Sequence, residues 1–336
     1  MRIAIVGAGA IGGVCAGLIR KEGYDVELIC SNDTQADQIN ANGLTIQGIR
    51  GQFTIELPAK GSIEQMTPAP DVVLLAVKAT TMLDAAQRLL PLITPSTQVV
   101  SLQNGICEHA LGRVLGPERV IGCVTGWGST FLAPDTFEMT STGEFMVGYL
   151  DRPADNTLQA VQQMLSCVVP VTISEDIIGD LYSKLIINSC ITSLGAVCGL
   201  YLGQMLAEKQ ARLVFFAVMK EAMEVAKAMD IHVPAYAGKL DYKTFFIPQG
   251  WFADLKRHLF LRVMGFKYRR LKSSSLQSLE RGRKTEIDYL TGFVTSNAQE
   301  NGIRVPVNQQ IYDMVREIEA GKRSISAANI QQIRVE

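Results

Sequence analysis

A lysine and an asparagine in an apolar segment are the residues whose types and spacing could most directly do chemistry. In "YSKLIINSCITSLGAV", residues 182–197, the only charged side chain is Lys184, and Asn188 follows it four residues later. An ammonium group is costly to bury without a partner. If the segment is helical, this spacing places both side chains on one face, a turn apart. The pattern predicts an ammonium and an amide that act together, although a snorkelling lysine would give the same pattern.

A carboxylate and a group of hydroxyls follow near the end of the chain. "KTEIDYLTGF" carries Glu286 and Asp288 at the predicted start of a helix, where the helix dipole favours carboxylates. Just upstream, Ser273, Ser274 and Ser275 supply hydroxyls. Taken alone, Glu286 could simply serve the helix N-terminus.

Together, a lysine, an amide and a carboxylate suit the reduction of a carbonyl. Hydride addition to a carbonyl creates an alkoxide, which needs a proton donor and hydrogen-bond donors at its oxygen. Partial desolvation lowers the pKa of a lysine toward a useful value, and a nearby carboxylate can tune and orient it. With a nicotinamide cofactor, these residues predict a carbonyl reductase.

The beginning of the chain predicts the nucleotide site that such a reaction needs. A strand, "RIAIV", runs directly into "GAGAIG" at residues 7–12, and an amphipathic stretch and a second strand, "DVELIC", follow. This is the context that a dinucleotide-binding glycine pattern requires. Gly7 would allow the tight turn, Gly9 the close approach of a pyrophosphate, and Gly12 close helix packing. The first helical N–H groups, at Ala10 and Ile11, would then bind phosphate.

The end of the second predicted strand bears on the choice of cofactor. It reads Cys30-Ser31-Asn32-Asp33, with no acidic residue at the strand end for ribose hydroxyls and no arginine for a 2′-phosphate. Ser31 and Asn32 could donate to a phosphate. NADP is therefore favoured, and NAD is not excluded.

Strands alternating with helices predict an α/β, Rossmann-like, doubly wound parallel sheet in residues 1–174, the NAD(P)-binding domain. "LTIQGI" and "GQFTIEL" predict a hairpin, residues 71–77 and 97–103 predict strands, and residues 80–91 predict a helix. Lys78 and Asn104 follow the two strands, at the carboxyl ends where such sheets bind ligands. A solvated loop lysine and an Asn-Gly turn are the simpler explanations.

Residues 175–336 predict an all-α, substrate-binding and catalytic domain. Strand signals disappear there, and helical periodicity covers 175–200, 205–230, 284–302 and 306–319.

Composition limits the remaining classes of function. The formal charge of −1 gives no basic field for nucleic acid. The three histidines are far apart and predict no metal site, and seven cysteines without CxxC pairs indicate a reducing cytoplasm. Glycines interrupt the N-terminal apolar run, so it does not read as a secretory signal, and no membrane attachment is expected.

These motifs resemble those of the ketopantoate reductases (2-dehydropantoate 2-reductases) over nearly the whole chain. The matching pieces are "GAGAIGG" at 7–13, "LLAVKA" at 74–79, "LQNG" at 102–105, "KLIIN" at 184–188, "SSLQSLERGRKTEIDYLTG" at 274–292 and "NGIRVPVN" at 301–308. The resemblance implies a C-terminal domain like that of 6-phosphogluconate dehydrogenase. It also implies a cytoplasmic, NADPH-dependent oxidoreductase of pantothenate biosynthesis that reduces 2-dehydropantoate to pantoate.

The resemblance also implies the role of each site residue. Lys184 matches the general acid, and Glu286 matches the carboxylate that engages the lysine and the substrate hydroxyl. Asn104 and Asn188 match amide donors, and Ser274 matches the hydroxyl that holds the substrate carboxylate. Lys78 matches a lysine near cofactor and substrate.

Four positions depart from the family pattern. Thr192, which we expect to bind substrate, replaces a second asparagine one turn beyond Asn188, and Leu181 replaces a tryptophan before the lysine. Ser278 replaces the aspartate of an "LQD" sequence, and the arginine for the 2′-phosphate is absent. None removes the acid, but they leave open a different 2-oxo acid or an imine as substrate. A non-catalytic NADP(H)-binding sensor is the alternative outside the enzymes.

The segment "WFADLKRHLFLRVMGFKYRRLK", residues 251–272, interleaves aromatic and basic side chains beyond what the family motifs need. Three interpretations are open: a solvated amphipathic helix over the substrate cleft, a cationic lid for an anionic substrate tail or cofactor phosphate, and a membrane or nucleic-acid patch. Apolar surface on the long helices also allows a homodimer.

Overall fold

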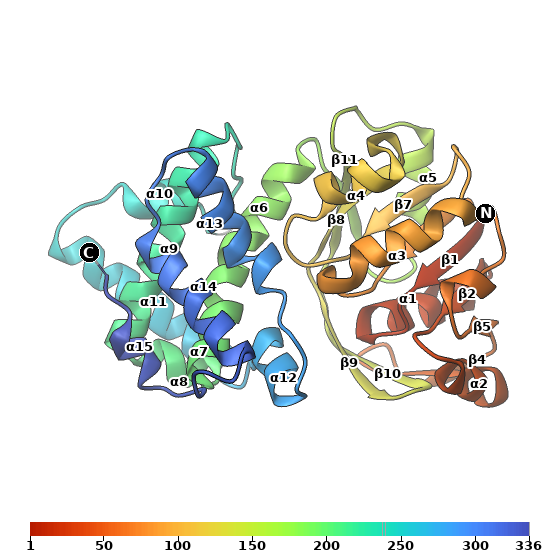
Figure 1. Cartoon of the computed structure of the whole chain (residues 1–336), viewed down its shortest axis with the longest axis horizontal. Helices are drawn as coiled ribbons and strands as arrows, with labels where there is room; N and C mark the ends of the chain where they lie inside the picture. Colours follow the sequence, from red (N-terminus) through yellow and green to blue (C-terminus); the bar gives the residue numbers. More distant parts are fainter. Residues whose placement is uncertain (237, 239, 336) are drawn as a thin grey trace. The chain divides into compact units, whose positions relative to one another are not determined.

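The structure is a computed structural model that describes residues 1–236, 238 and 240–335. The chain forms two compact units, Met1–Ile178 and Gly179–Glu336, and the division falls within helix α6 (Ile177–Asn188) (Figure 1). The domain boundary expected between residues 174 and 175 stays a prediction.

The first unit is built on a mixed eight-stranded sheet. Its strand order is β12-β11-β8-β7-β6-β1-β2-β5. The strands are β1 (Arg2–Val6), β2 (Asp25–Ile29), β5 (Ala59–Lys60), β6 (Val72–Leu75), β7 (Gln98–Ser101), β8 (Val120–Thr125), β11 (Phe145–Tyr149) and β12 (Val171–Ile173). The pairs from β8 to β5 are parallel, which confirms the predicted parallel sheet, and β11 is antiparallel to β8. The central strands β1, β6, β7 and β8 are rich in β-branched residues and almost wholly buried, and they form the core of the unit.

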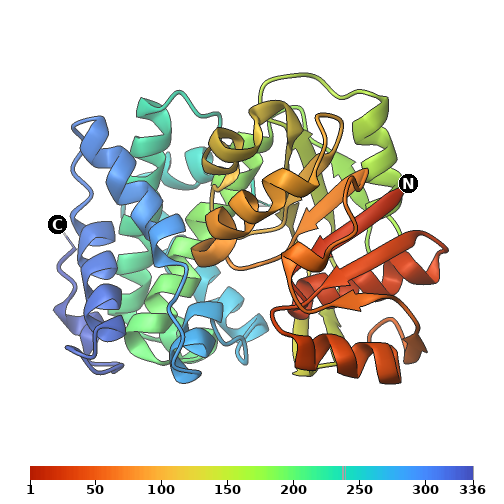
Figure 2. The same ribbon diagram turned by 45° about the vertical axis from the view of Figure 1, so that its right-hand side comes forward.

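Helices cover both faces of this sheet. The helices of the unit are α1 (Ala10–Lys21), α2 (Asp33–Asn42), α3 (Met82–Leu89), α4 (Glu108–Leu115) and α5 (Asn156–Leu165). Right-handed crossovers place α1 on one face and α3 and α4 on the other, because the chain runs in opposite directions across the sheet from β1 and from β6. Figure 2 shows α3 and α4, in orange and gold, side by side. A ligand crevice is expected where the strand order reverses, beyond β1 and β6.

A second, four-stranded sheet explains the glycines of α1. Its order is β4 (Phe53–Ile55), β3 (Leu44–Gly48), β10 (Thr136–Ser141) and β9 (Gly128–Ala133). Strands β3 and β4 are the predicted hairpin. A Cβ at Gly13 would lie 2.4 Å from the ring of Phe137, and one at Gly17 would lie 2.5 Å from Ile46 Cγ1. These two glycines therefore allow α1 to pack directly on this sheet.

The second unit is helical, as predicted. Its helices are α6, α7 (Leu194–Cys198), α8 (Leu202–Ala207), α9 (Lys209–Ala228), α10 (Tyr242–Phe246), α11 (Trp251–Lys267), α12 (Ser274–Glu280), α13 (Thr291–Glu300), α14 (Pro306–Glu319) and α15 (Asn329–Gln332). In the described part of this unit, the only β pairing is an isolated bridge between Tyr236 and Leu240. The predicted helix 205–230 is divided between α8 and α9, and the one at 284–302 starts only at Thr291.

A π-helical turn, Ser189–Ser193, joins α6 to α7. The combined helix, Ile177–Cys198, is apolar and long enough to cross a membrane by length and composition, but 78% of its most apolar window is buried in the protein. This burial is typical of a core helix.

Helix α11 is held by a buried arginine of α9. The guanidinium of Arg212 donates from Nε to His258 Nδ1 (3.0 Å) and from Nη1 to the carbonyl oxygens of Leu206 (2.7 Å) and Ala207 (2.6 Å). Burial, then the charges of Arg212 and Lys209, lower the pKa of His258. The contact to Nδ1 requires a neutral ring.

We expect protonation of His258 to destabilise the protein. The pKa of His258 in the folded protein lies below its unfolded value of about 6.5. The stability contributed by the hydrogen bond from Arg212 to neutral His258 is therefore present above about pH 6.5 and is lost as the pH falls below about 6.5. A hydrogen bond from a charged donor contributes about 1.5–3 kcal/mol. The midpoint of thermal unfolding should fall by about 3–6 °C more for the wild type than for His258→Asn between about pH 7.5 and 5.5. Equal decreases in both proteins would contradict this.

Candidate functional site

The glycine-rich turn after β1 has the shape of a dinucleotide cradle. Gly7 has φ of +113°, and its N–H donates to the carbonyl oxygen of Ile29 at 2.9 Å. A Cβ at Gly12 would lie 2.0 Å from the carbonyl oxygen of Gly7. By contrast, a Cβ at Gly9 would meet nothing within 4 Å. The turn is therefore closed on the protein side and open at Gly9, which fits a bound pyrophosphate.

The start of α1 adds hydrogen-bond donors to this cradle. Gly9 is the N-cap and provides no side-chain cap, so the first N–H groups, at Ala10 and Ile11, have no acceptor from that side chain. Buried Gln35 holds the loop in place, since its Nε2 donates to the carbonyl oxygens of Ala8 and Pro134, both at 3.0 Å. The sequence analysis did not identify Gln35, because its partners are distant in sequence.

The predicted cofactor-selecting residues lie at the carboxyl end of β2. Asn32 caps α2: its Oδ1 accepts from the N–H of Gln35 at 2.9 Å, and its Nδ2 donates to Ser31 Oγ at 3.1 Å. Strand β5 pairs with β2 and places Lys60 beside Ile29, and the N–H of Cys30 donates to the Lys60 carbonyl oxygen at 2.7 Å. A basic residue therefore lies near this strand end, although none follows the strand in sequence.

Lys78 and Asn104 lie on neighbouring loops, after β6 and β7. Buried Gln103 joins the two loops. Its Nε2 donates to the carbonyl oxygens of Leu75 (2.7 Å) and Val77 (2.9 Å), and its Oε1 accepts from Ser101 Oγ at 2.9 Å. Gln103 belongs to a motif that the sequence analysis singled out, but its positioning role was not identified.

We expect Gln103→Leu to loosen these loops. It removes both donated bonds. The Leu75 carbonyl keeps the N–H of Leu102 (3.1 Å), but the Val77 carbonyl loses the Gln103 donor, which costs about 1–3 kcal/mol of stability. The KM for cofactor or substrate should rise about 5–10-fold, because a displacement of about 1 Å is costly to binding and catalysis. Gln98→Leu, a buried glutamine at the other end of β7, is the matched control. An equal KM change in the control would show that the effect is general destabilisation.

In the second unit, Lys184 and Asn188 both lie on α6, and Lys184 is half-buried. The helix is anchored next to the lysine. The hydroxyl of Tyr182 donates to the carbonyl oxygen of Ala222 on α9 (2.8 Å). The hydroxyl of Tyr242 donates to the backbone carbonyl oxygen of Ser183 (2.8 Å). These bonds fix the part of the helix from which Lys184 projects.

The π-helical turn after Asn188 gathers the elements that carry the other predicted residues. Thr192 lies within this turn and is buried. Ser274 is the first residue of α12, which packs against the turn and α7. Ser193 Oγ lies 2.7 Å from Thr291 Oγ1, at the start of α13. Such turns are rare and often mark functional sites.

The expectation that Glu286 begins a helix was wrong. Glu286 precedes a short 3₁₀ turn, Ile287–Tyr289, and α13 begins at Thr291. The neighbouring Thr285 is held by Glu319, whose Oε1 accepts from both its N–H and its hydroxyl at 2.7 Å. The carboxylate is thus presented by a turn rather than by a regular helix.

Within the described ranges, no group of three or more His, Cys, Asp or Glu side chains is arranged to hold a metal ion. All seven cysteines are thiols, and six are buried. Burial alone raises the pKa of Cys30 to about 12, which makes this thiol unreactive.

Comparison with known proteins assigns the family. Residues 3–152 match the family described as "Ketopantoate reductase PanE/ApbA", and residues 176–319 match "Ketopantoate reductase PanE/ApbA C terminal". The chain belongs to the ketopantoate reductase family. The resemblance found in the sequence is therefore confirmed, and the protein is an oxidoreductase that acts on CH–OH groups with a dinucleotide cofactor.

Relatives match over almost their whole length. The chain is 28% identical to a 2-dehydropantoate 2-reductase of Pyrococcus abyssi over 95% of this chain and 98% of that protein. It is 25% identical to an uncharacterized oxidoreductase, YkpB, of Bacillus subtilis over 96% and 100%. Among solved structures, a PanE/ApbA family ketopantoate reductase from Ralstonia eutropha superposes with a TM-score of 0.82 at 27% identity, over 96% of this chain and 100% of that one.

Proposed function

We propose that the protein reduces 2-dehydropantoate to pantoate with NADPH in the cytoplasm. The observation that carries the proposal is the anchored helix with Lys184 and Asn188, which runs into the π-helical turn that contacts the Ser274-bearing helix. The full-length similarity to 2-dehydropantoate 2-reductases supports the choice of substrate. The buried thiols fit a reducing compartment.

The cofactor would be held by the turn Gly7–Gly12, with Ser31, Asn32, Lys60 and Lys78 as further candidates. When bound, it supplies a hydride for the carbonyl carbon. Lys60, next to the end of β2, is the basic residue that would favour the 2′-phosphate of NADPH. Lys60→Ala should then reduce the preference for NADPH over NADH by about 10-fold in kcat/KM, the effect of about 1.4 kcal/mol. An unchanged preference would remove this role.

Lys184 donates a proton to the carbonyl oxygen, which becomes the hydroxyl of the product. Asn188 and Asn104 donate hydrogen bonds to the substrate oxygens, and the Ser274 hydroxyl binds the substrate carboxylate. Glu286 accepts a hydrogen bond from the substrate's own hydroxyl. A proton donor and fixed hydrogen-bond donors stabilise the charge that develops on the oxygen.

The test compares 2-dehydropantoate with 3,3-dimethyl-2-oxobutanoate, which lacks only the hydroxyl. A site built to bind that hydroxyl should disfavour the analogue by about 100-fold or more in kcat/KM. Glu286→Gln should lower kcat/KM for 2-dehydropantoate and reduce this discrimination. Equal rates with both compounds in the wild type would rule out 2-dehydropantoate as the specific substrate.

A different 2-oxo acid of similar size is the second candidate. Thr192, in the π-helical turn, has a hydroxyl where the family pattern has an amide, and its side chain is buried. This changes the donors available to a substrate. A kcat/KM that is highest for a 2-oxo acid without the terminal hydroxyl would favour this function.

A further inference from the structure

Helix α11 has an unusual distribution of apolar side chains. Its inner face, with Leu261 and Gly265, is buried. The opposite face is apolar as well: Phe252, Leu255, Leu259, Val263 and Phe266 are 61%, 55%, 59%, 56% and 73% exposed. At 100° per residue, these five side chains, which we call the α11 apolar face, fall within an arc of about 80°. Exposed apolar patches of this kind mark interaction sites, and a solvated helix would carry polar residues there.

The spacing of the α11 apolar face is symmetric about Leu259. Phe252 and Phe266 lie at equal distances along the sequence on either side of it, and so do Leu255 and Val263. A two-fold interface is self-complementary, because each contact occurs twice with the two copies exchanged. In an antiparallel pair of α11 helices centred on Leu259, Phe252 meets Phe266 of the second copy, and Leu255 meets Val263.

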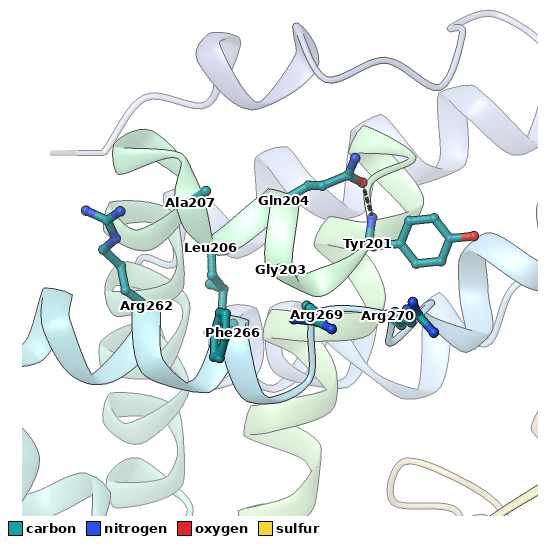
Figure 3. A pocket seen from close by; sticks show the side chains of 10 residues that line it. Tyr201, Gly203, Gln204, Leu206, Ala207, Arg262, Phe266, Arg269 and Arg270 are labelled. Carbon is teal, nitrogen blue, oxygen red and sulfur yellow. Dashed lines mark hydrogen bonds between the residues drawn. The ribbon is translucent and has the colours of Figure 1, made fainter.

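The ends of the helix fit the same arrangement. Trp251 is 70% exposed and its ring lies tilted against that of Phe252, with the ring centroids 3.9 Å apart. At the other end, a groove of about 510 Å³ lies between α8 and α11. Its lining includes Arg262 and Phe266 from α11 and Arg269 just beyond the end of this helix, shown with α8 in Figure 3.

The groove lies on the same flank of α11 as Trp251. Arg262 follows Trp251 by three turns and points within about 20° of it. A two-fold axis that lies in the interface, perpendicular to the helices, reverses the direction of the second helix but leaves its flank on the same side. Trp251 of the second copy therefore faces the groove. Among the described residues, neither Arg262 nor Arg269 takes part in an ion pair. Arg269 already lies 5.5 Å from the centroid of the Phe266 ring. Guanidinium groups bind an aromatic face through cation–π contacts.

The exposed apolar area approaches that of a standard interface. An aromatic side chain buries about 150–250 Å², so Trp251, Phe252 and Phe266 supply roughly 400 Å² per copy at their exposed fractions. Leu255, Leu259 and Val263 extend this toward the about 800 Å² per partner of a standard interface. We infer that the α11 apolar face is the two-fold interface of a homodimer, in which the Trp251 of each copy docks on the arginine-lined groove of the other.

An anionic membrane is the competing occupant, because basic residues flank the apolar face. A bilayer would require apolar and basic side chains but not their symmetry about Leu259. A second copy explains both the symmetry and the aromatic end opposite the arginines. The occupant is therefore a second copy of this chain.

The first test measures the mass in solution. At micromolar concentration, light scattering should give the wild type a mass of about twice its chain mass of 36.7 kDa. Leu259→Asp, which places two carboxylates on the two-fold axis, should weaken dimerisation by at least about 100-fold. Leu132→Asp, at a residue 46% exposed on β9, is the matched control and should remain dimeric. A monomeric wild type, or a dimer that Leu259→Asp leaves intact, would overturn the inference.

The second test checks the geometry. Leu259→Cys should form a disulfide-linked dimer under mild oxidation, because residue 259 of one copy lies next to residue 259 of the other at the two-fold axis. Val263→Cys should not, but a mixture of Leu255→Cys and Val263→Cys chains should form the mixed dimer. Wild type treated in the same way controls for the native cysteines. Cross-linking of all three variants alike, or a monomer that sediments with phosphatidylserine vesicles, would reject the antiparallel pair.

Discussion

Lys184→Ala should lower kcat for reduction of the 2-oxo acid by about 10²–10⁴-fold, the usual contribution of a general acid. The substitution would remove the proposed proton donor, whereas Tyr182, Ser183 and Tyr242, which supply bonds that anchor α6, are unchanged. Cofactor affinity should therefore stay within a few-fold of the wild type. Steady-state kinetics and a fluorescence titration of reduced cofactor measure the two effects separately.

The control variants distinguish acid catalysis from a simple need for positive charge. Lys184→Arg keeps the charge but is a poor proton donor, because a guanidinium does not deprotonate in the working pH range, so its kcat should remain low. Lys220→Ala, an exposed lysine on α9, should leave kcat unchanged. The alkaline limb of the kcat profile should also disappear in Lys184→Ala.

Two results would contradict the assignment. Recovery of most activity in Lys184→Arg would show that charge alone is required. A kcat within about 10-fold of the wild type in Lys184→Ala would move the general acid to another residue. In either case the family fold would remain, and only the chemistry assigned to α6 would change.

The local patterns of the first half predicted its fold well. Buried parallel strands read as continuous apolar runs, and β1, β6 and β7 appear where such runs occur. What could not be predicted there depends on contacts between distant segments. Lys60 reaches the end of β2 only because β5 pairs with it, and Gln35 and Gln103 reveal their roles only through the carbonyls they bind.

In the second half, the helices were easier to predict than their ends. Helix α14 spans the predicted residues 306–319, because Pro306 is well suited to a first helical position. The π-helical turn after Asn188 left no recognisable signal, since its residues are compatible with a regular helix. The late start of α13 depends on Thr285 and Glu319, which are far apart in sequence. The outward apolar face of α11 was also missed, because composition alone cannot show which face of a helix is buried.

Gly12→Ala should strongly disturb the nucleotide-binding turn. The added Cβ would lie 2.0 Å from the carbonyl oxygen of Gly7 and 3.0 Å from Ala76 Cβ, so the turn or the helix must move. Overpacking of this kind costs about 1–3 kcal/mol or more. We expect unfolding to begin about 5–10 °C lower and dinucleotide affinity to fall by at least about 10-fold, because the displaced turn can no longer present its N–H groups.

Gly9→Ala separates cofactor approach from folding. Its Cβ meets nothing within 4 Å in the protein, and its extended backbone, with φ of −87°, suits any residue. The thermal midpoint should therefore match the wild type, while the new methyl group keeps a pyrophosphate from the first N–H groups of α1 and weakens binding about 10-fold or more. Differential scanning fluorimetry and a cofactor titration measure the two quantities on the same samples.

If Gly9→Ala binds reduced cofactor as tightly as the wild type, the pyrophosphate does not lie against this turn. The severe effect of Gly12→Ala would then be purely structural, since only Gly9 reports on the open side of the turn.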